Sequence, residues 1–142
     1  MGSRWGITPR QSIEAECARR GRMKLIVDCV DLLEGRSVDD ELLLALAGPP
    51  ARAVLDGRAG GRHGYWPRVW AARGLLHTWD DIATEAVIRA MSDDSWRVRE
   101  MIAKVVAAHG VDRATPALAI LLDDPVPRVR KNAERALTKL VY

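Results

Sequence analysis

Two stretches near the C-terminus decide the fold: DDSWRVR at residues 93–99 and DPVPRVR at residues 124–130. The second begins 31 residues after the first, and apolar residues follow each stretch at the same spacing. These apolar residues are Val98, Ile102, Val105 and Val106 in the first copy, and Val129, Ala133, Ala136 and Leu137 in the second. Self-similarity at this period predicts stacked helical units that bury their apolar faces against their neighbours.

A second helical segment repeats with the same 31-residue offset. Its apolar residues are Ala83, Ala86, Val87, Ala90 and Met91 in one copy, and Ala114, Ala117, Leu118, Leu121 and Leu122 in the next. Both sets follow the spacing of one helix face. Because two separate segments share one offset, we interpret the repeating unit as a pair of helices.

Helix start and stop signals occur along the whole chain, and no segment has the alternation typical of a strand. Thr8, Pro9 and Gln11 form a capping box with proline in the first turn, and Gly21 ends that helix. The expected helices are residues 9–20, 22–34, 41–46, 51–55, 67–76, 82–91, 95–109, 114–122 and 125–141. The sequence therefore predicts an all-α chain of about nine helices, with 67–76 paired to 82–91, 95–109 paired to 114–122, and 125–141 closing the array.

Length and composition favour one folded domain. The chain has 142 residues, of which 48% are hydrophobic, and a net charge of +3. We divide residues 1–142 into a divergent helical part (1–56), a flexible glycine-rich loop (57–64) and the repeats (65–142). Cys17 and Cys29 lack the spacing of a metal or redox site, and no apolar run approaches the roughly 20 residues of a membrane span. With no targeting leader, we expect a cytoplasmic protein.

Residues 64–142 resemble the HEAT-repeat family, specifically its short bacterial repeats of the phycobilin-lyase type. The resemblance rests on an Asp in the turn and an Arg six residues later, found here as Asp93 with Arg99 and as Asp124 with Arg130. It implies a right-handed α-solenoid of antiparallel helix pairs, in which these residues form a hydrogen-bonded ladder between repeats. It also implies a scaffold used for protein contacts.

The earliest unit departs from this pattern, because Gly64 takes the place of the Asp and Trp70 that of the Arg. We therefore expect this unit to leave the ladder and face a partner. Tryptophan and arginine dominate interface hot spots. The predicted partner-binding residues are Arg58, Arg62, Trp66, Trp70 and Arg73. The alternative is that both indoles fill the core between the repeats and the N-terminal helices.

The last expected helix carries a basic stripe on the side opposite its apolar residues. The stripe consists of Arg128, Lys131, Arg135 and Lys139, at helical spacings of three and four. One interpretation is a solvated end cap, which terminal repeats need. The other is a surface for nucleic-acid phosphates or for an acidic partner.

No set of catalytic groups is identifiable. His63, His77 and His109 accompany no acidic residue at ligand spacing, so we expect no metal and no cofactor. Residues 96–101 resemble helix starts of the HEAT-like alkylpurine DNA glycosylases, but no position here matches their catalytic Asp. We therefore predict a non-catalytic module that binds another protein. Nucleic-acid binding through the last helix is the alternative, and the oligomeric state stays open.

Overall fold

The computed structural model describes residues 7–141, so the ends of the predicted domain, residues 1–6 and 142, lie outside it. Within the described range the chain is helical and contains no strand, which confirms the all-α prediction. Its helices are α1 (Pro9–Arg20), α2 (Arg22–Leu33), α3 (Asp40–Ala47), α4 (Ala51–Leu55), α5 (Trp66–His77), α6 (Thr84–Ala90), α7 (Trp96–His109), α8 (Thr115–Leu121) and α9 (Pro127–Val141). Short 3-10 turns at Gly61–His63, Asp81–Ala83 and Asp112–Ala114 precede α5, α6 and α8.

The helix ends follow the local sequence. The Thr8 hydroxyl accepts a hydrogen bond from the Gln11 amide (3.1 Å), and the Gln11 side chain accepts one from the Thr8 amide (2.9 Å), so the predicted capping box is confirmed. Helix α7 ends at Gly110, whose φ of 62° lies in the left-handed region that favours glycine. Local signals therefore determine where these helices begin and end.

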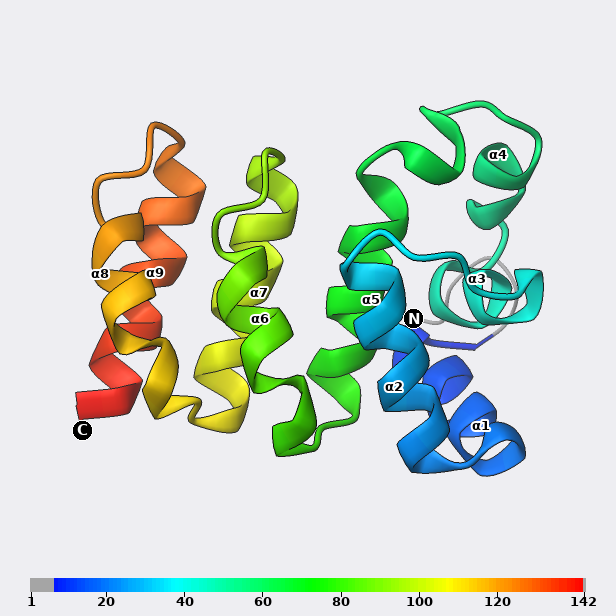
Figure 1. The fold of residues 1–142 in the computed structure, drawn as a ribbon, viewed down its shortest axis with the longest axis horizontal. Helices are drawn as coiled ribbons and strands as arrows, with labels where there is room; N and C mark the ends of the chain where they lie inside the picture. Colours follow the sequence, from blue (N-terminus) through cyan, green and yellow to red (C-terminus); the bar gives the residue numbers. More distant parts are fainter. Residues whose placement is uncertain (1–6, 142) are drawn as a thin grey trace.

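The helices form two layers, with the repeats at one end of the molecule and α1, α3 and α4 at the other (Figure 1). Helices α5, α7 and α9 lie side by side in one layer, and α2, α6 and α8 form the second. Helix α3 continues the first layer beyond α5, and α1 packs against α2 and α3. The core between the layers is continuous from Ile13 to Ala136.

The helix pairs differ from those expected from the sequence. Helix α6 packs closely on α7, and α8 packs closely on α9, whereas α5 packs closely on α2. The sequence pairing of 67–76 with 82–91 and of 95–109 with 114–122 is therefore wrong by one helix. Residues 34–65, which include α3 and α4, separate the two helices of the first pair along the chain. Because α2 and α5 are not consecutive in the sequence, the pairing of consecutive helices could not predict their contact.

Helix α2 has the same buried pattern as α6 and α8. Leu25, Cys29 and Leu32 are buried at the spacing of Ala83, Val87 and Ala90 in α6, and of Ala114, Leu118 and Leu121 in α8. The repeat pattern therefore extends N-terminal to residue 65. Residues 7–141 contain three equivalent helix pairs, and a long insertion (residues 34–65) interrupts the first.

Gly74 is the point of closest approach between α5 and its neighbours. A Cβ atom at this position would lie 2.7 Å from Cys29 Sγ of α2 and 2.9 Å from Leu46 Cδ2 of α3. Real Cβ atoms do not approach other heavy atoms this closely. The absence of a side chain at Gly74 thus allows α5 to pack against the second layer and the insertion together.

We predict that Gly74→Ala destabilises the protein by about 1–3 kcal/mol because it overpacks this crossing. In an exposed helix the same change would stabilise by about 0.5–1 kcal/mol, so the sign of the effect is diagnostic. Urea unfolding followed by circular dichroism measures it. Adding Cys29→Ala, which removes the nearest atom, should recover part of the loss. A Gly74→Ala variant more stable than the parent would contradict this packing.

A buried guanidinium joins α1, α2 and α3. The Arg20 side chain is 5% exposed and pairs with Glu16 (2.7 Å), Asp28 (2.7 Å) and Asp39 (2.8 Å). Asp39 also accepts the Leu42 amide at the start of α3 (2.8 Å). The hydrogen bond from Arg20 and the one from the Leu42 amide lower the pKa of Asp39 to about 2. Arg20 therefore fixes the orientation of the N-terminal helices.

We predict that Arg20→Met destabilises by about 1–3 kcal/mol, because three carboxylates lose the guanidinium that they share. Arg19 still pairs with Glu16, and Lys24 still pairs with Asp28. Arg52→Met is the control, since Arg52 is exposed and has no ion pair among the described residues. The folded pKa of Asp39 is depressed, so its contribution to stability is complete above about pH 4 and is lost as the pH falls toward 2. Thermal unfolding between pH 2 and 7 should show a smaller acid-dependent loss in Arg20→Met than in the parent.

Candidate functional site

Arg99 connects two consecutive repeats. Its Nη1 atom donates to the backbone oxygen of Asp93 (2.7 Å), within its own repeat. Its Nε and Nη2 atoms donate to the Asp124 carboxylate of the next repeat, at 2.7 and 3.2 Å. Asp124 also accepts the Val126 amide (2.9 Å). One guanidinium therefore sets the position of the following helix pair.

Arg68 makes the equivalent contact in the first pair. Its Nε and Nη2 atoms donate to the Asp93 carboxylate at 2.7 and 3.1 Å. The 31-residue offset relates Arg68 to Arg99, so the first unit keeps the register of the others. The assignment of Trp70 to the ladder arginine was therefore wrong by two residues, because Arg68 takes that place. Arg68 Nη1 donates to the Gly64 backbone oxygen (3.1 Å), as Arg99 Nη1 does to that of Asp93, so this unit does take part in the ladder.

Each aspartate of the ladder is paired with an arginine of the preceding repeat. The Asp124 side chain is 4% exposed. Burial alone would raise the pKa of Asp124, but hydrogen bonds from Arg99 and from the Val126 amide hold it below its ordinary value. At the end of the array, Arg130 donates to the backbone oxygen of Asp124 (2.7 Å) and meets no carboxylate among residues 7–141. These residues stabilise the stack rather than offering a binding site.

We predict that Arg99→Met costs about 3 kcal/mol, because the buried Asp124 carboxylate loses its cation. Arg130→Met is the matched control in the same motif and should cost about 1 kcal/mol or less, since an exposed side chain loses one bond to a carbonyl. Chemical unfolding of the two variants at pH 7 gives both values. Equal losses would mean that the bridge between repeats contributes no more than the contact within one.

The structure brings three of the five predicted partner-binding residues together. Trp66, Trp70 and Arg73 line a cavity of about 300 Å³ between α5 and α4. Its remaining walls are apolar and come from the insertion: Ala47, Pro50, Ala53, Val54 and Ala59. The predicted site is therefore a cavity beneath α4 rather than an open edge of the repeats.

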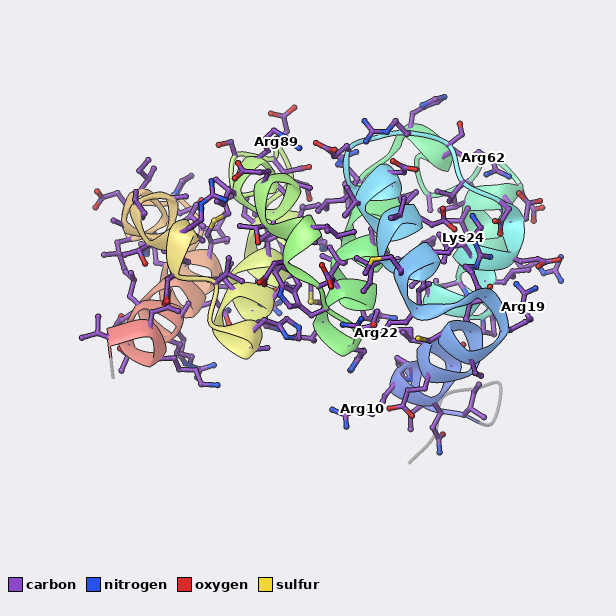
Figure 2. The ribbon with its side chains drawn as sticks, turned by 60° about the horizontal axis from the view of Figure 1, so that its bottom comes forward. Arg10, Arg19, Arg22, Lys24, Arg62 and Arg89 are labelled. Carbon is purple, nitrogen blue, oxygen red and sulfur yellow. The ribbon has the colours of Figure 1, made fainter. Side chains whose placement is uncertain are left out.

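The other two predicted residues lie elsewhere. Arg58 pairs with Asp56 (3.0 Å), and Arg62 forms an ion pair with Asp40 at the start of α3. Figure 2 shows Arg62 on the α3 side of the molecule. Neither side chain lines the cavity of Trp66. The expectation of one edge formed by both arginines and the indoles is corrected accordingly.

Trp70 belongs to the core. Trp70 is 4% exposed, because α3 packs against α5 and residues of α4 line the space beside it. The expectation that Trp70 lies on an open surface is therefore wrong, and the alternative of a core residue is supported for this indole. Trp66 is only partly buried. Its ring stacks on Trp70 with 6.4 Å between centroids and an interplanar angle of 25°.

Aromatic rings and guanidinium groups alternate at the N-terminal ends of α5, α7 and α9. Arg97 lies over the rings of Trp66 (5.5 Å) and Trp96 (4.5 Å), and Arg128 lies over Trp96 (5.2 Å). Cation–π contacts at these distances stabilise by roughly 0.5–1 kcal/mol each where they are exposed. Trp66, Arg97 and Arg128 follow one another at 31-residue intervals. The repeat therefore extends to this surface row.

The predicted basic stripe divides into two parts. Arg128 pairs with Glu100 of α7 at 2.7 Å. Lys131, Arg135 and Lys139 are exposed and have no ion pair among the described residues. Lys104 of α7 occupies the position equivalent to Arg135, in the neighbouring parallel helix. We call Lys104, Lys131, Arg135 and Lys139 the basic face.

Lys104 is a residue that the sequence analysis did not assign to a site. Its stripe on α7 reads Arg97, Glu100, Lys104 and Ala108, which looks mixed in sign. In the structure, Arg128 and Asn132 of α9 both contact Glu100, which is 7% exposed. Arg128 therefore neutralises Glu100, and the remaining charged residues of this stripe, Arg97 and Lys104, are basic. Only the packing of α9 on α7 shows this.

Other kinds of site are not found in the part of the chain that the structure covers. No group of three or more His, Cys, Asp or Glu side chains in residues 7–141 is arranged to hold a metal ion. His109 directs Nε2 at the backbone oxygens of Leu75 (2.8 Å) and Leu76 (3.1 Å) at the end of α5. No described helix combines the length and apolar character needed to span a membrane.

Comparison with known proteins gives one result. The family model described as HEAT repeats matches residues 65–138, which is more than half of the chain. No curated protein and no solved structure gives a significant match. The matched range covers α5 to α9 and both complete copies of the ladder motif.

Proposed function

Because the chain belongs to the HEAT-repeat family, we propose that it is a non-catalytic module whose basic face binds an acidic surface of another protein. HEAT repeats generally mediate protein–protein interaction or scaffolding. The observation that carries the proposal is the exposure of Lys131, Arg135 and Lys139 on one side of α9, without carboxylate partners among the described residues. A cytoplasmic location is part of the proposal, and Cys17 and Cys29 are free thiols.

The contrast with the rest of the molecule supports this assignment. Arg20, Arg68 and Arg99 hold the fold together through their ion pairs. The cations of the basic face have no comparable structural partner within residues 7–141. Complementary charge accelerates encounter and selects partners. An acidic partner could therefore associate faster and more selectively through this face, without breaking the ion pairs that hold the repeats together.

The row of tryptophans and arginines at the N-terminal ends of α5, α7 and α9 would extend the interface. A stable protein interface buries about 800 Å² on each side and concentrates its energy in tryptophan and arginine. Trp96 and Arg97 lie at the start of α7, about two turns before Lys104, and both are partly exposed. We assign them to the same partner contact as the basic face.

Binding of nucleic-acid phosphates is the second candidate, because the same cations suit it. Each phosphate neutralised by a cation releases counterions, so affinity would fall steeply with salt. A gel-shift series with a DNA duplex and an RNA hairpin between 50 and 200 mM salt tests it. A shift that weakens by roughly tenfold or more over this range favours nucleic acid. The absence of any shift removes this candidate.

We predict that Lys131→Glu with Arg135→Glu lowers the affinity for the protein partner roughly tenfold or more, because like charges then face each other. Arg10→Glu with Arg52→Glu is the matched control, since both cations are exposed and neither has an ion pair among the described residues. The partner is first captured from lysate with the parent protein and identified by mass spectrometry. Its affinity for each variant is then measured by calorimetry. Equal affinities for both double variants would reject the basic face as the binding site.

A further inference from the structure

The guanidinium of Arg73 is partly buried and has no ion pair with any residue in the range 7–141. Its one hydrogen bond among the described contacts runs from Nη1 to the Leu46 backbone oxygen at a long 3.4 Å. Burial lowers the pKa of Arg73, and no carboxylate contributes to its environment. A guanidinium has five donor hydrogens and stays protonated in proteins. A partly buried cation with free donors favours an anion at this position.

The cavity beside Arg73 is otherwise apolar. The two indoles form one wall, and the aliphatic side chains of Pro50, Ala53 and Val54 form the wall opposite. Its volume of about 300 Å³ is at the lower limit of ligand pockets, which span roughly 300–1,000 Å³. This size suits one apolar side chain with its carboxylate.

The cavity walls are fixed before any ligand enters. Trp66 is held between the Trp70 ring (6.4 Å) and the Arg97 guanidinium (5.5 Å). The loop after α4 is held by backbone hydrogen bonds from Gly57 to Val54 (3.0 Å) and from Arg58 to Ala53 (2.7 Å). A preorganised site binds with a smaller loss of conformational entropy.

We propose that this cavity binds the C-terminal residue of a partner polypeptide, with an apolar side chain against Trp66 and the terminal carboxylate on Arg73. A C-terminal residue is the part of a polypeptide in which a free carboxylate and an apolar side chain share one Cα atom. An internal Asp or Glu offers the anion without the apolar group. The proposal rests on the proposed protein-binding function and adds a second contact, at the other end of the repeats from the basic face.

The test uses a probe peptide, acetyl-Ser-Gly-Ser-Gly-Leu with a free C-terminus, and the same peptide as its C-terminal amide. Binding is followed by the indole Nε1–H signals of Trp66 and Trp70 in nitrogen-15 NMR spectra, assigned with Trp→Phe variants. We expect the free acid to shift both signals and to bind at least tenfold more tightly than the amide. Equal affinity for acid and amide would overturn the proposal.

Substitutions at two positions separate the carboxylate contact from the apolar contact. Arg73→Met should remove the preference for the acid, and Arg73→Lys should keep part of it. Ala53→Phe fills the cavity from α4 and should abolish binding of both peptides while α5 stays intact. Circular dichroism verifies that each variant is folded. Unchanged binding by Ala53→Phe would place the peptide outside the cavity and reject the assignment.

Two further comparisons complete the test. The basic-face variant with Lys131→Glu and Arg135→Glu should bind the peptide normally, so that a failure of the proposed function and a failure of this site give different results. Hexanoate, a small carboxylate with an apolar chain, should bind more weakly than the peptide. Hexanoate affinity equal to that of the peptide would identify a site for small carboxylates and overturn the assignment to a polypeptide C-terminus.

Discussion

The bridge from each ladder arginine to the aspartate of the next repeat determines how the helix pairs stack. Arg68 and Arg99 each donate two hydrogen bonds to a carboxylate, and that carboxylate also accepts a backbone amide at the start of the next helix. Because the same group orders the turn and receives the guanidinium, α5, α7 and α9 keep a constant relation to one another. Surface residues 31 positions apart therefore form rows across the layer.

The insertion between α2 and α5 changes one of these rows. Arg73, Lys104 and Arg135 occupy equivalent positions, but α3 and α4 cover α5 and leave α7 and α9 uncovered. Arg73 lines an apolar cavity in the first pair, whereas Lys104 is half-buried and Arg135 is exposed in the other two. Gly74 permits this cover, because α5 can approach Cys29 and Leu46 only without a side chain there. The two proposed contacts, a carboxylate on Arg73 and an acidic surface on the basic face, therefore use the same position of the repeat.

The repeats and most helix ends could be predicted from the sequence, because capping residues and apolar spacing act locally. The register of the first unit could not be predicted. The residue equivalent to the motif valine is Pro67, and Val69, two residues later, was aligned with that valine instead. The pairing of α2 with α5 depends on a contact across residues 34–65, which no local pattern encodes. The burial of Trp70 has the same origin, because the helices that cover it belong to that insertion.

The distinction between structural and binding cations depends on their surroundings rather than on their sequence. In the sequence, Arg20 and Arg99 cannot be distinguished from Arg73 and Arg135. In the structure, Arg20 pairs with several carboxylates, and Arg99 pairs with an aspartate of the next repeat. Glu100 shows the converse, because an acidic residue in the middle of a stripe is neutralised by Arg128 from the neighbouring helix. A charged residue of a helical repeat can therefore be assigned to binding only after the charges on both adjacent helices have been matched. In the described part of the chain, that matching leaves the basic face, Arg73 and a few single cations such as Arg10 and Arg52 without a carboxylate. The basic face differs from those single cations because its side chains are grouped, and Arg73 differs because it lines an apolar cavity.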